Sequence, residues 1–344
     1  MRVRVPDYFD GFSCLAGACP HSCCIGWEVV LDEDTVRRYQ QLPGALGERL
    51  RDAMALDGED VCFPLDGRRC PFLNQENLCD IHCALGPEAT SVTCREHPRF
   101  IEDYGPFQEI TLSAACPKAN ELLLGTRDPL TFSERQDNQP TEDGDEWLDW
   151  LVPLRDRLLD LLRDRSRSLK ARLRDFLLVA GEAQQLLDSE NMAELAAFCT
   201  EPWAISAETA AGSGSWEAAA CQCLQDPGNS GTGLACAAET VGASTGIARL
   251  RSPRPRKAGT HRRVLRLPVS AEGRQRWRPA GRAQFCALGV LVTDRLSRFV
   301  GLPEALRLFS REIEHDEDNL ATLREQFWQT EGLSLSALLA AFCG

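Results

Sequence analysis

Hydrophobic residues recur every three or four positions in two long stretches of the chain, which is the spacing of an amphipathic α-helix. The first stretch runs from Glu146 to about Phe198 and contains Leu151, Leu154, Leu158, Leu161, Leu162, Leu169, Leu173, Phe176 and Leu177. The second covers residues 284–343 and contains Phe285, Leu288, Val292, Leu296, Phe299, Leu320, Leu323, Phe327 and a run from Leu333 to Phe342. We expect these side chains to form the core of a helical domain. Since Pro153 is tolerated only in a first turn, the first helix should begin near Leu151.

Residues 1–125 have few long periodic stretches and many turn-forming pairs. Here the pattern predicts one helix over 34–54, with Asp34 as its N-cap and an interruption at Pro43-Gly44. A second helix should cover 117–124, with its proline in the first turn. We expect the remainder to be short irregular segments that a bound metal organises in part.

Two further segments lack any regular period. Residues 126–145 are polar and typical of a linker. Residues 206–283 begin rich in Ala, Gly and Ser, and positions 249–282 then contain 11 Arg, one Lys and one acidic residue. This segment is a disordered basic linker, the product of a reading-frame error in a GC-rich gene, or an anion-binding arm. The predicted fold is mainly α: a cysteine-rich unit (1–125), the linker, and a helical domain in two parts (146–205 and 284–344) on either side of residues 206–283.

Length and charge narrow the possible partners. The chain has 344 residues, typical of about two domains. It contains no run of about 18 apolar residues, and its first twelve residues lack the apolar core of a secretory signal. Its net charge of −13 argues against a nucleic-acid partner. We therefore expect a cytoplasmic protein that binds neither nucleic acid nor membrane; the sequence gives no indication of its oligomeric state.

Cysteines are the most unusual feature of the composition. The chain has 16 of them, and ten lie within the first 116 residues. In a reducing compartment disulfides are rare, so such a cluster favours metal binding or redox chemistry over a disulfide scaffold. The pairs Cys14/Cys19, Cys19/Cys23 and Cys79/Cys83 have a spacing that can direct thiolates toward one metal centre.

The type of metal stays open between an iron–sulfur cluster and zinc, with no metal as the third alternative. The cluster is favoured because there is no Cys-x2-Cys knuckle, the histidines lack zinc-finger spacing, and prolines follow Cys19, Cys70 and Cys116. Cys23 and Cys24 are adjacent, and we do not expect both to ligate one ion because successive side chains point apart.

Several motifs resemble those of one known family. They are FSC-x4-C-x3-CC-x-GW (12–27), CPFL-x5-C-x-I (70–81), S-x-TC-x3-PR (91–99), LSAACP (112–117) and FSREIEHDEDNL (309–320). With them the chain resembles the flagellin lysine-N-methylase (FliB) family, whose cysteine-rich part is similar to proteins described as zinc- or iron-chelating. The N-terminal match covers about a third of the chain, and residues 206–283 do not look like the family.

The resemblance implies an enzyme that transfers methyl groups from S-adenosylmethionine to lysine ε-amines of flagellin. It also implies a 4Fe–4S cluster, with zinc as the alternative metal. The cluster would be held by some of Cys14, Cys19, Cys23, Cys24, Cys70, Cys79, Cys94 and Cys116. Cys62 and Cys83 lie outside the family pattern.

Lysine methylation requires an amine without its proton, held in line with the methyl donor. Arg311, Glu314, His315 and Asp318 have the spacing of one helix face, on which His315 would accept the proton and Glu314 or Asp318 attract the lysine; the alternative is an exposed salt-bridged face. Trp27 would stack on the substrate or adenine, or pack over the metal-binding loop. Arg99 would bind a carboxylate, or serve as a structural ion-pair partner.

No Gly-x-Gly-type loop follows a predicted strand, so the usual nucleotide-binding signature for the methyl donor is missing. The donor would instead bind beside the cluster, whose iron would take its amino and carboxylate groups. Two other classes of function remain open: a non-catalytic zinc- or iron-binding interaction module, and a redox iron–sulfur protein.

Overall fold

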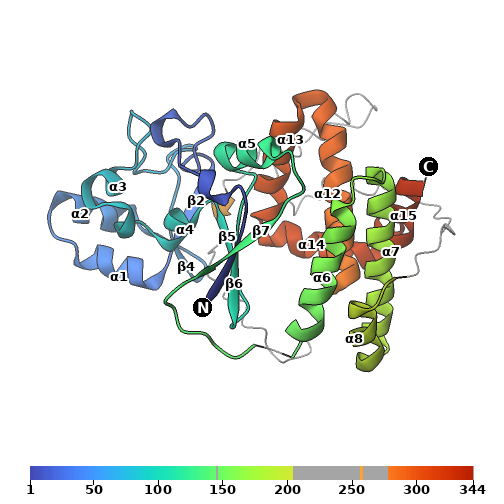
Figure 1. Ribbon diagram of the computed structural model, residues 1–344. Helices are drawn as coiled ribbons and strands as arrows, with labels where there is room; N and C mark the ends of the chain where they lie inside the picture. Colours follow the sequence, from blue (N-terminus) through green and yellow to red (C-terminus); the bar gives the residue numbers. More distant parts are fainter. Residues whose placement is uncertain (145, 204–255, 259–277, 344) are drawn as a thin grey trace.

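Helices and two small sheets make up the part of the chain that the computed structural model describes, namely residues 1–144, 146–203, 256–258 and 278–343. The prediction of a mainly helical fold is confirmed. Figure 1 shows the short helices α1–α4 on one side, the long helices on the other, and a four-stranded sheet between them. Most of residues 206–283 lies outside the described residues. The three interpretations of that segment therefore concern residues that the structure does not describe.

The N-terminal unit is less irregular than expected, because it contains two sheets. The first has the order β5-β6-β1-β7, formed by β5 (Arg99–Asp103), β6 (Phe107–Leu112), β1 (Arg2–Pro6) and β7 (Phe132–Gln136). β1 runs parallel to β6 and antiparallel to β7. β7 lies inside the segment predicted as a linker. The strands of both sheets have three to six residues each, which is too few to show a clear hydrophobic period in the sequence.

The second sheet has the order β3-β4-β2-β8, formed by β3 (Ala55–Asp57), β4 (Asp60–Phe63), β2 (Trp27–Leu31) and β8 (Arg256–Ala258). Around it lie α1 (Glu33–Gln41), α2 (Gly44–Ala53), α3 (Asp80–Leu85) and α4 (Val92–Glu96). Tyr39, Leu50 and Phe72 are almost fully buried in the core that these elements share.

The N-cap of α1 is Asp32 rather than the expected Asp34. Its carboxylate accepts a hydrogen bond from the Thr35 amide at 2.9 Å and another from the Val92 amide at 2.9 Å. Asp32 therefore joins the start of α1 to the start of α4, a long-range contact that the local pattern could not reveal. The interruption at Pro43 is confirmed, since α1 ends at Gln41 and α2 begins at Gly44.

The helical part consists of α6 (Leu148–Arg163), α7 (Leu169–Asp188), α8 (Met192–Thr200), α12 (Pro279–Val300), α13 (Leu302–Phe309), α14 (Glu317–Gln329) and α15 (Leu335–Cys343). Leu154, Leu177 and Leu338 are almost fully buried, as the periodicity predicted. α6 begins three residues earlier than expected, so Pro153 lies in its second turn. None of the described helices is long and apolar enough to cross a membrane.

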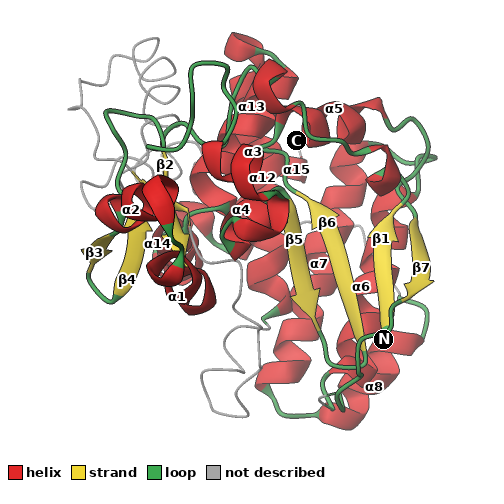
Figure 2. Cartoon of the chain, turned by 90° about the vertical axis from the view of Figure 1, so that its left-hand side faces the viewer, coloured by secondary structure: helices red, strands yellow, loops and turns green. Residues whose placement is uncertain are grey.

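Side-chain contacts attach the N-terminal unit to the helices. Arg155 of α6 forms an ion pair with Glu109 of β6 at 2.6 Å, and Figure 2 shows the first sheet in front of α6 and α7. The predicted helix after Cys116 is α5 (Pro117–Gly125). Asn120 on α5 donates to the carbonyl of Pro303 on α13 at 2.8 Å. These contacts bring the cysteine loops and the segment after α13 to the same place.

Candidate functional site

A cavity of about 560 Å³ lies where the N-terminal loops, α3, α4 and the segment after α13 meet. Its lining includes seven of the eight predicted metal ligands: Cys14, Cys19, Cys23, Cys24, Cys79, Cys94 and Cys116. Trp27, Arg99 and His315 also line it. Most of the residues singled out from the sequence therefore line one cavity, although they come from segments up to 301 positions apart, from Cys14 to His315.

Cys70 is the predicted ligand that does not line the cavity. It is buried among the apolar residues beneath the wall, and its amide donates to the carbonyl of Cys24 at 2.8 Å. Cys62 and Cys83, which fall outside the family pattern, do not line the cavity either. Cys62 is buried in β4, whereas Cys83 is exposed on α3.

Cys23 and Cys24 point the same way, contrary to the expectation that adjacent side chains diverge. Both line the cavity, and the Cys23 thiol is hydrogen-bonded to the Cys24 sulfur. The reason is a tight turn, in which the amides of Cys24 and Ile25 both donate to Ser22. The bond from Cys23 lowers the pKa of Cys24 to about 7, and the same bond together with burial raises the pKa of Cys23 well above its ordinary value.

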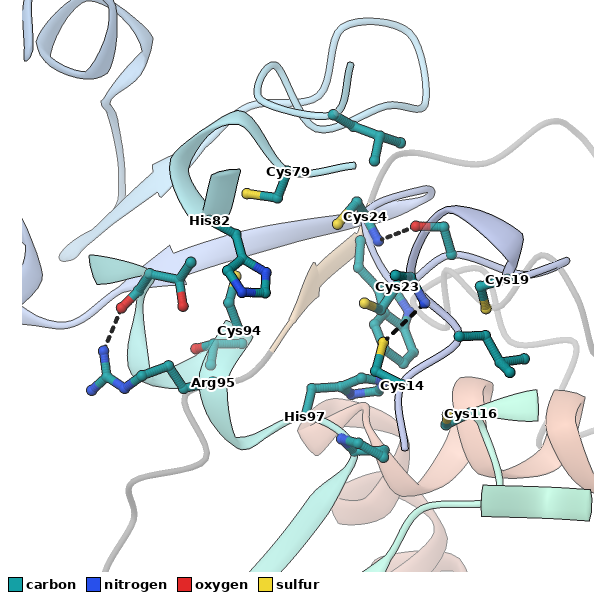
Figure 3. A pocket seen from close by; sticks show the side chains of 18 of the residues that line it. Cys14, Cys19, Cys23, Cys24, Cys79, His82, Cys94, Arg95, His97 and Cys116 are labelled. Atoms are coloured by element: carbon teal, nitrogen blue, oxygen red, sulfur yellow. Dashed lines mark hydrogen bonds between the residues drawn. The ribbon is translucent and has the colours of Figure 1, made fainter. Parts of the chain in front are cut away.

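The other thiols fall on the two sides of this pair (Figure 3). Cys79 and Cys94 lie on one side, close enough to Cys24 for their charges to interact. On the other side Cys116 interacts in the same way with Cys19 and Cys14. Burial raises the pKa of Cys94 to about 12, even though its side chain is exposed to the cavity, and it also raises the pKa values of Cys79 and Cys116.

The thiols surround a space instead of converging on one point. Among the described residues, no group of three or more His, Cys, Asp or Glu side chains is close enough to hold a metal ion. A structural zinc ion needs four ligands at about 2.0–2.3 Å from one centre. The donor set is nevertheless soft and rich in sulfur, which is the chemistry that iron–sulfur clusters and zinc share.

Aromatic rings and imidazoles form the floor of the cavity. The ring of Trp27 lies 5.4 Å from that of His97 and 5.0 Å from that of His315, between centroids. Phe100 stacks on His315 at 4.8 Å. The guanidinium of Arg311 lies over Trp27 at 5.3 Å, so Trp27 is a packed part of this floor and only 7% exposed.

The expected common helix face around His315 is wrong in its geometry. Residues 310–314 form a π-helical turn that ends at His315, and the side chain of Asp318 lies outside the described residues. Glu314 does not line the cavity; its carboxylate accepts a hydrogen bond from the Ser310 hydroxyl. Arg311 lies 3.6 Å from the carboxylate of Glu312.

His315 has a hydrogen-bonded neighbour that the sequence reasoning missed. Its Nε2 lies 2.6 Å from the Ser113 hydroxyl, and Ser113 lies 3.0 Å from the hydroxyl of Ser310. His97, which lines the floor, was also missed. His97, Ser113 and Ser310 lie within the motifs at 91–99, 112–117 and 309–320, so these motifs were the signal that could have found them.

Arg99 carries a positive charge into the cavity wall. Its guanidinium lies 5.5 Å from the ring of Phe12 and 6.0 Å from that of Phe9. No carboxylate in the described part of the chain forms an ion pair with Arg99. The structural ion pair that was the alternative role for this residue is therefore absent from that part.

Three curated proteins are similar to this chain. The flagellar biosynthetic protein FliU of Salmonella muenchen is 30% identical over 143 residues, which is 40% of this chain and 85% of FliU. Lysine-N-methylases of Salmonella choleraesuis and Salmonella typhimurium are each 30% identical over 148 residues, 41% of this chain. The chain belongs to the lysine-N-methylase (FliB) family.

Family membership confirms the resemblance seen in the motifs. The matched part spans 37% of the length of each of the two lysine-N-methylases. No family model matches the chain, and no solved structure matches it.

Proposed function

We propose that this protein is a protein-lysine N-methyltransferase that takes methyl groups from S-adenosylmethionine, acts on flagellin, and depends on a 4Fe–4S cluster held in the cavity. The observation that carries the proposal is the gathering of seven thiols, Arg99 and His315 around one cavity in a chain of the lysine-N-methylase family. The flagellar name of the Salmonella muenchen relative supports flagellin as the substrate.

The distribution of the thiols supports a cluster over zinc. A cluster of several atoms is wider than one ion, so its ligands stand farther apart and can surround a space of about 560 Å³. The ligands would come from the seven cysteines of the wall. When bound, such a cluster supplies iron that can take the amino and carboxylate groups of the donor. Burial raises the pKa values of Cys79, Cys94 and Cys116 and so favours their protonated forms, and loading of these thiols would release protons.

The charge of the wall suits both reactants. None of the lining residues that the structure describes is Asp or Glu, whereas they include Arg95, Arg99 and four histidines. Arg99 would bind the carboxylate oxygen of the donor that the cluster does not take. A cavity without carboxylates disfavours the ammonium form of a lysine and favours the neutral amine, which alone has the lone pair that attacks. The acidic attraction for lysine that the sequence suggested is therefore not part of this site.

His315 would act as the general base. In the transfer the methyl–sulfur bond breaks with its electrons remaining on sulfur, while the amine lone pair forms the new nitrogen–carbon bond. The proton leaves the lysine nitrogen for the imidazole of His315, which lines the cavity beside Trp27.

Anaerobic purification with iron, zinc and sulfide analysis, followed by a methyl-transfer assay on purified flagellin, tests the proposal. We expect about four irons and four sulfides per chain and transfer of labelled methyl groups. Cys94→Ser should lose iron and activity, whereas Cys83→Ser, outside the cavity, should keep both. Zinc without sulfide would indicate a structural zinc module. Iron and sulfide that respond reversibly to a reductant, without methyl transfer, would indicate a redox protein.

A further inference from the structure

We propose that Ser113, Ser310 and Glu314 form a proton relay that begins at His315 and leads away from the cavity. The proposal rests on the function proposed above, because the relay removes the proton that the substrate lysine must lose. It assigns roles to two serines that no sequence argument singled out, and it changes the role of Glu314 from attracting the lysine to accepting its proton.

The hydrogen bonds of the relay run in one direction. Ser310 donates to the carboxylate of Glu314, so its oxygen is left to accept from Ser113 at 3.0 Å. A hydroxyl has one proton to donate. Ser113 therefore accepts from the Nε2–H of His315 at 2.6 Å, and it also accepts from the Ala115 amide at 3.1 Å. This order fixes the Nε2–H tautomer of His315 and places the basic lone pair on Nδ1.

Protein atoms separate the two serines of the relay from solvent. Ser113 and Ser310 are each 1% exposed. Burial raises the pKa of Glu314, although the hydrogen bond from Ser310 acts in the opposite direction. The raised pKa brings the carboxyl closer to imidazole in proton affinity. Cys286 on α12 is close enough for its thiol to interact with the charge of Glu314.

The end of the relay lies within the π-helical turn. There the Ser310 hydroxyl donates to the carboxylate of Glu314, four residues later. Single π turns of this kind occur often at functional sites. Asn319 stabilises the turn, because its side-chain amide donates to the carbonyl of Glu312 at 2.6 Å.

The proton balance is complete without a further reactant. The lysine ammonium gives a proton to Nδ1 of His315, whose Nε2 gives its proton to Ser113. Ser113 gives its own proton to Ser310, and Ser310 gives its proton to Glu314. The net result is a neutral amine and a neutral carboxylic acid in place of an ammonium and a carboxylate, with the imidazole and both hydroxyls neutral as before.

The test combines a tautomer measurement with kinetics on the full chain. The protein contains five histidines. Nitrogen-15 NMR of histidine-labelled protein, with His315→Gln to assign the signal, should show the Nε2–H tautomer at His315. Ser113→Ala should disturb that tautomer. Glu314→Gln should preserve it, because the amide oxygen still accepts from Ser310, yet lower the single-turnover rate of methyl transfer about 10–100-fold without raising KM. Ser297→Ala, on the exposed end of α12, is the matched serine control and should change neither readout.

The outcomes separate the two proposals. An Nδ1–H tautomer in wild-type protein that transfers methyl groups would overturn the relay alone, and so would a Glu314→Gln variant with the wild-type rate. A wild-type protein with the cluster but without methyl transfer overturns the proposed function, and with it the role of the relay.

Discussion

Replacing Gly26 by alanine tests whether Arg311 holds the aromatic floor of the cavity in place. Gly26 stands directly before Trp27 and has a φ of +84°, a conformation that alanine adopts only with strain. A Cβ at this position would overlap the guanidinium of Arg311, which donates to the Ile25 carbonyl at 3.3 Å and covers the Trp27 ring.

The expected loss of stability has two parts. The left-handed backbone costs about 1–2 kcal/mol for a residue with a Cβ. Displacing Arg311 removes its cation–π contact and its hydrogen bond, together about 1–2 kcal/mol. Gly26→Ala should therefore lower the free energy of unfolding by about 2–4 kcal/mol. Gly44 is the matched control, because its φ is +80° and a Cβ there meets nothing within 4 Å. Gly44→Ala should cost only the backbone part, about 1–2 kcal/mol.

Urea unfolding followed by far-UV circular dichroism measures both variants, and a double-mutant cycle with Arg311→Ala isolates the overlap. In the Arg311→Ala background, Gly26→Ala should cost only about 1–2 kcal/mol, as at Gly44. Equal losses at Gly26 and Gly44 in the wild-type background would refute the reasoning, and so would an undiminished loss at Gly26 once Arg311 is gone.

Three further predictions concern hydrogen bonds and packing within the fold. Burial alone would raise the pKa of Asp32, but its hydrogen bonds hold this pKa below the ordinary value. Asp32→Ala should therefore cost about 1–2 kcal/mol of stability near pH 7. The loss should shrink as pH falls below about 4, through the folded pKa, which urea titrations repeated across pH would measure. Asn120→Ala should cost about 1–3 kcal/mol, because it removes the side-chain hydrogen bonds to the carbonyls of Ala114 and Pro303, and should speed hydrogen exchange in α5. Leu177→Ala, at a position with no exposure, should cost about 2–5 kcal/mol, whereas Leu169→Ala, 51% exposed on the same helix, should stay within about 0.5 kcal/mol by thermal unfolding.

The helices could be predicted from the sequence because their signal is local. Leu154 and Leu177 lie on the apolar faces that the periodicity indicated, and both are almost fully buried. The helix boundaries were harder to predict where a residue distant in the sequence helps to fix them. Asp32 caps α1 because it also binds the Val92 amide, 60 residues away.

The sheets and the linker show the opposite case. β1 pairs with residues 107–109 and with residues 132–136, and none of these segments is long enough to show a period of its own. Sheet pairing is a contact between distant segments, so a polar stretch such as β7 is stabilised by partners that its own composition does not reveal.

Periodicity, residue type and motif spacing are properties of short segments, so the helical segments, the concentration of thiols near the N-terminus and the family could all be predicted before the fold was known. Which of these residues meet depends on the packing of the whole chain. It brought seven cysteines and His315 to one cavity, left Cys70 beneath the wall, and joined Ser113 to His315 across 202 positions. The physical reason is that packing of α5 against α13 and of the first sheet against α6 sets these distances, and both depend on side chains far apart along the chain.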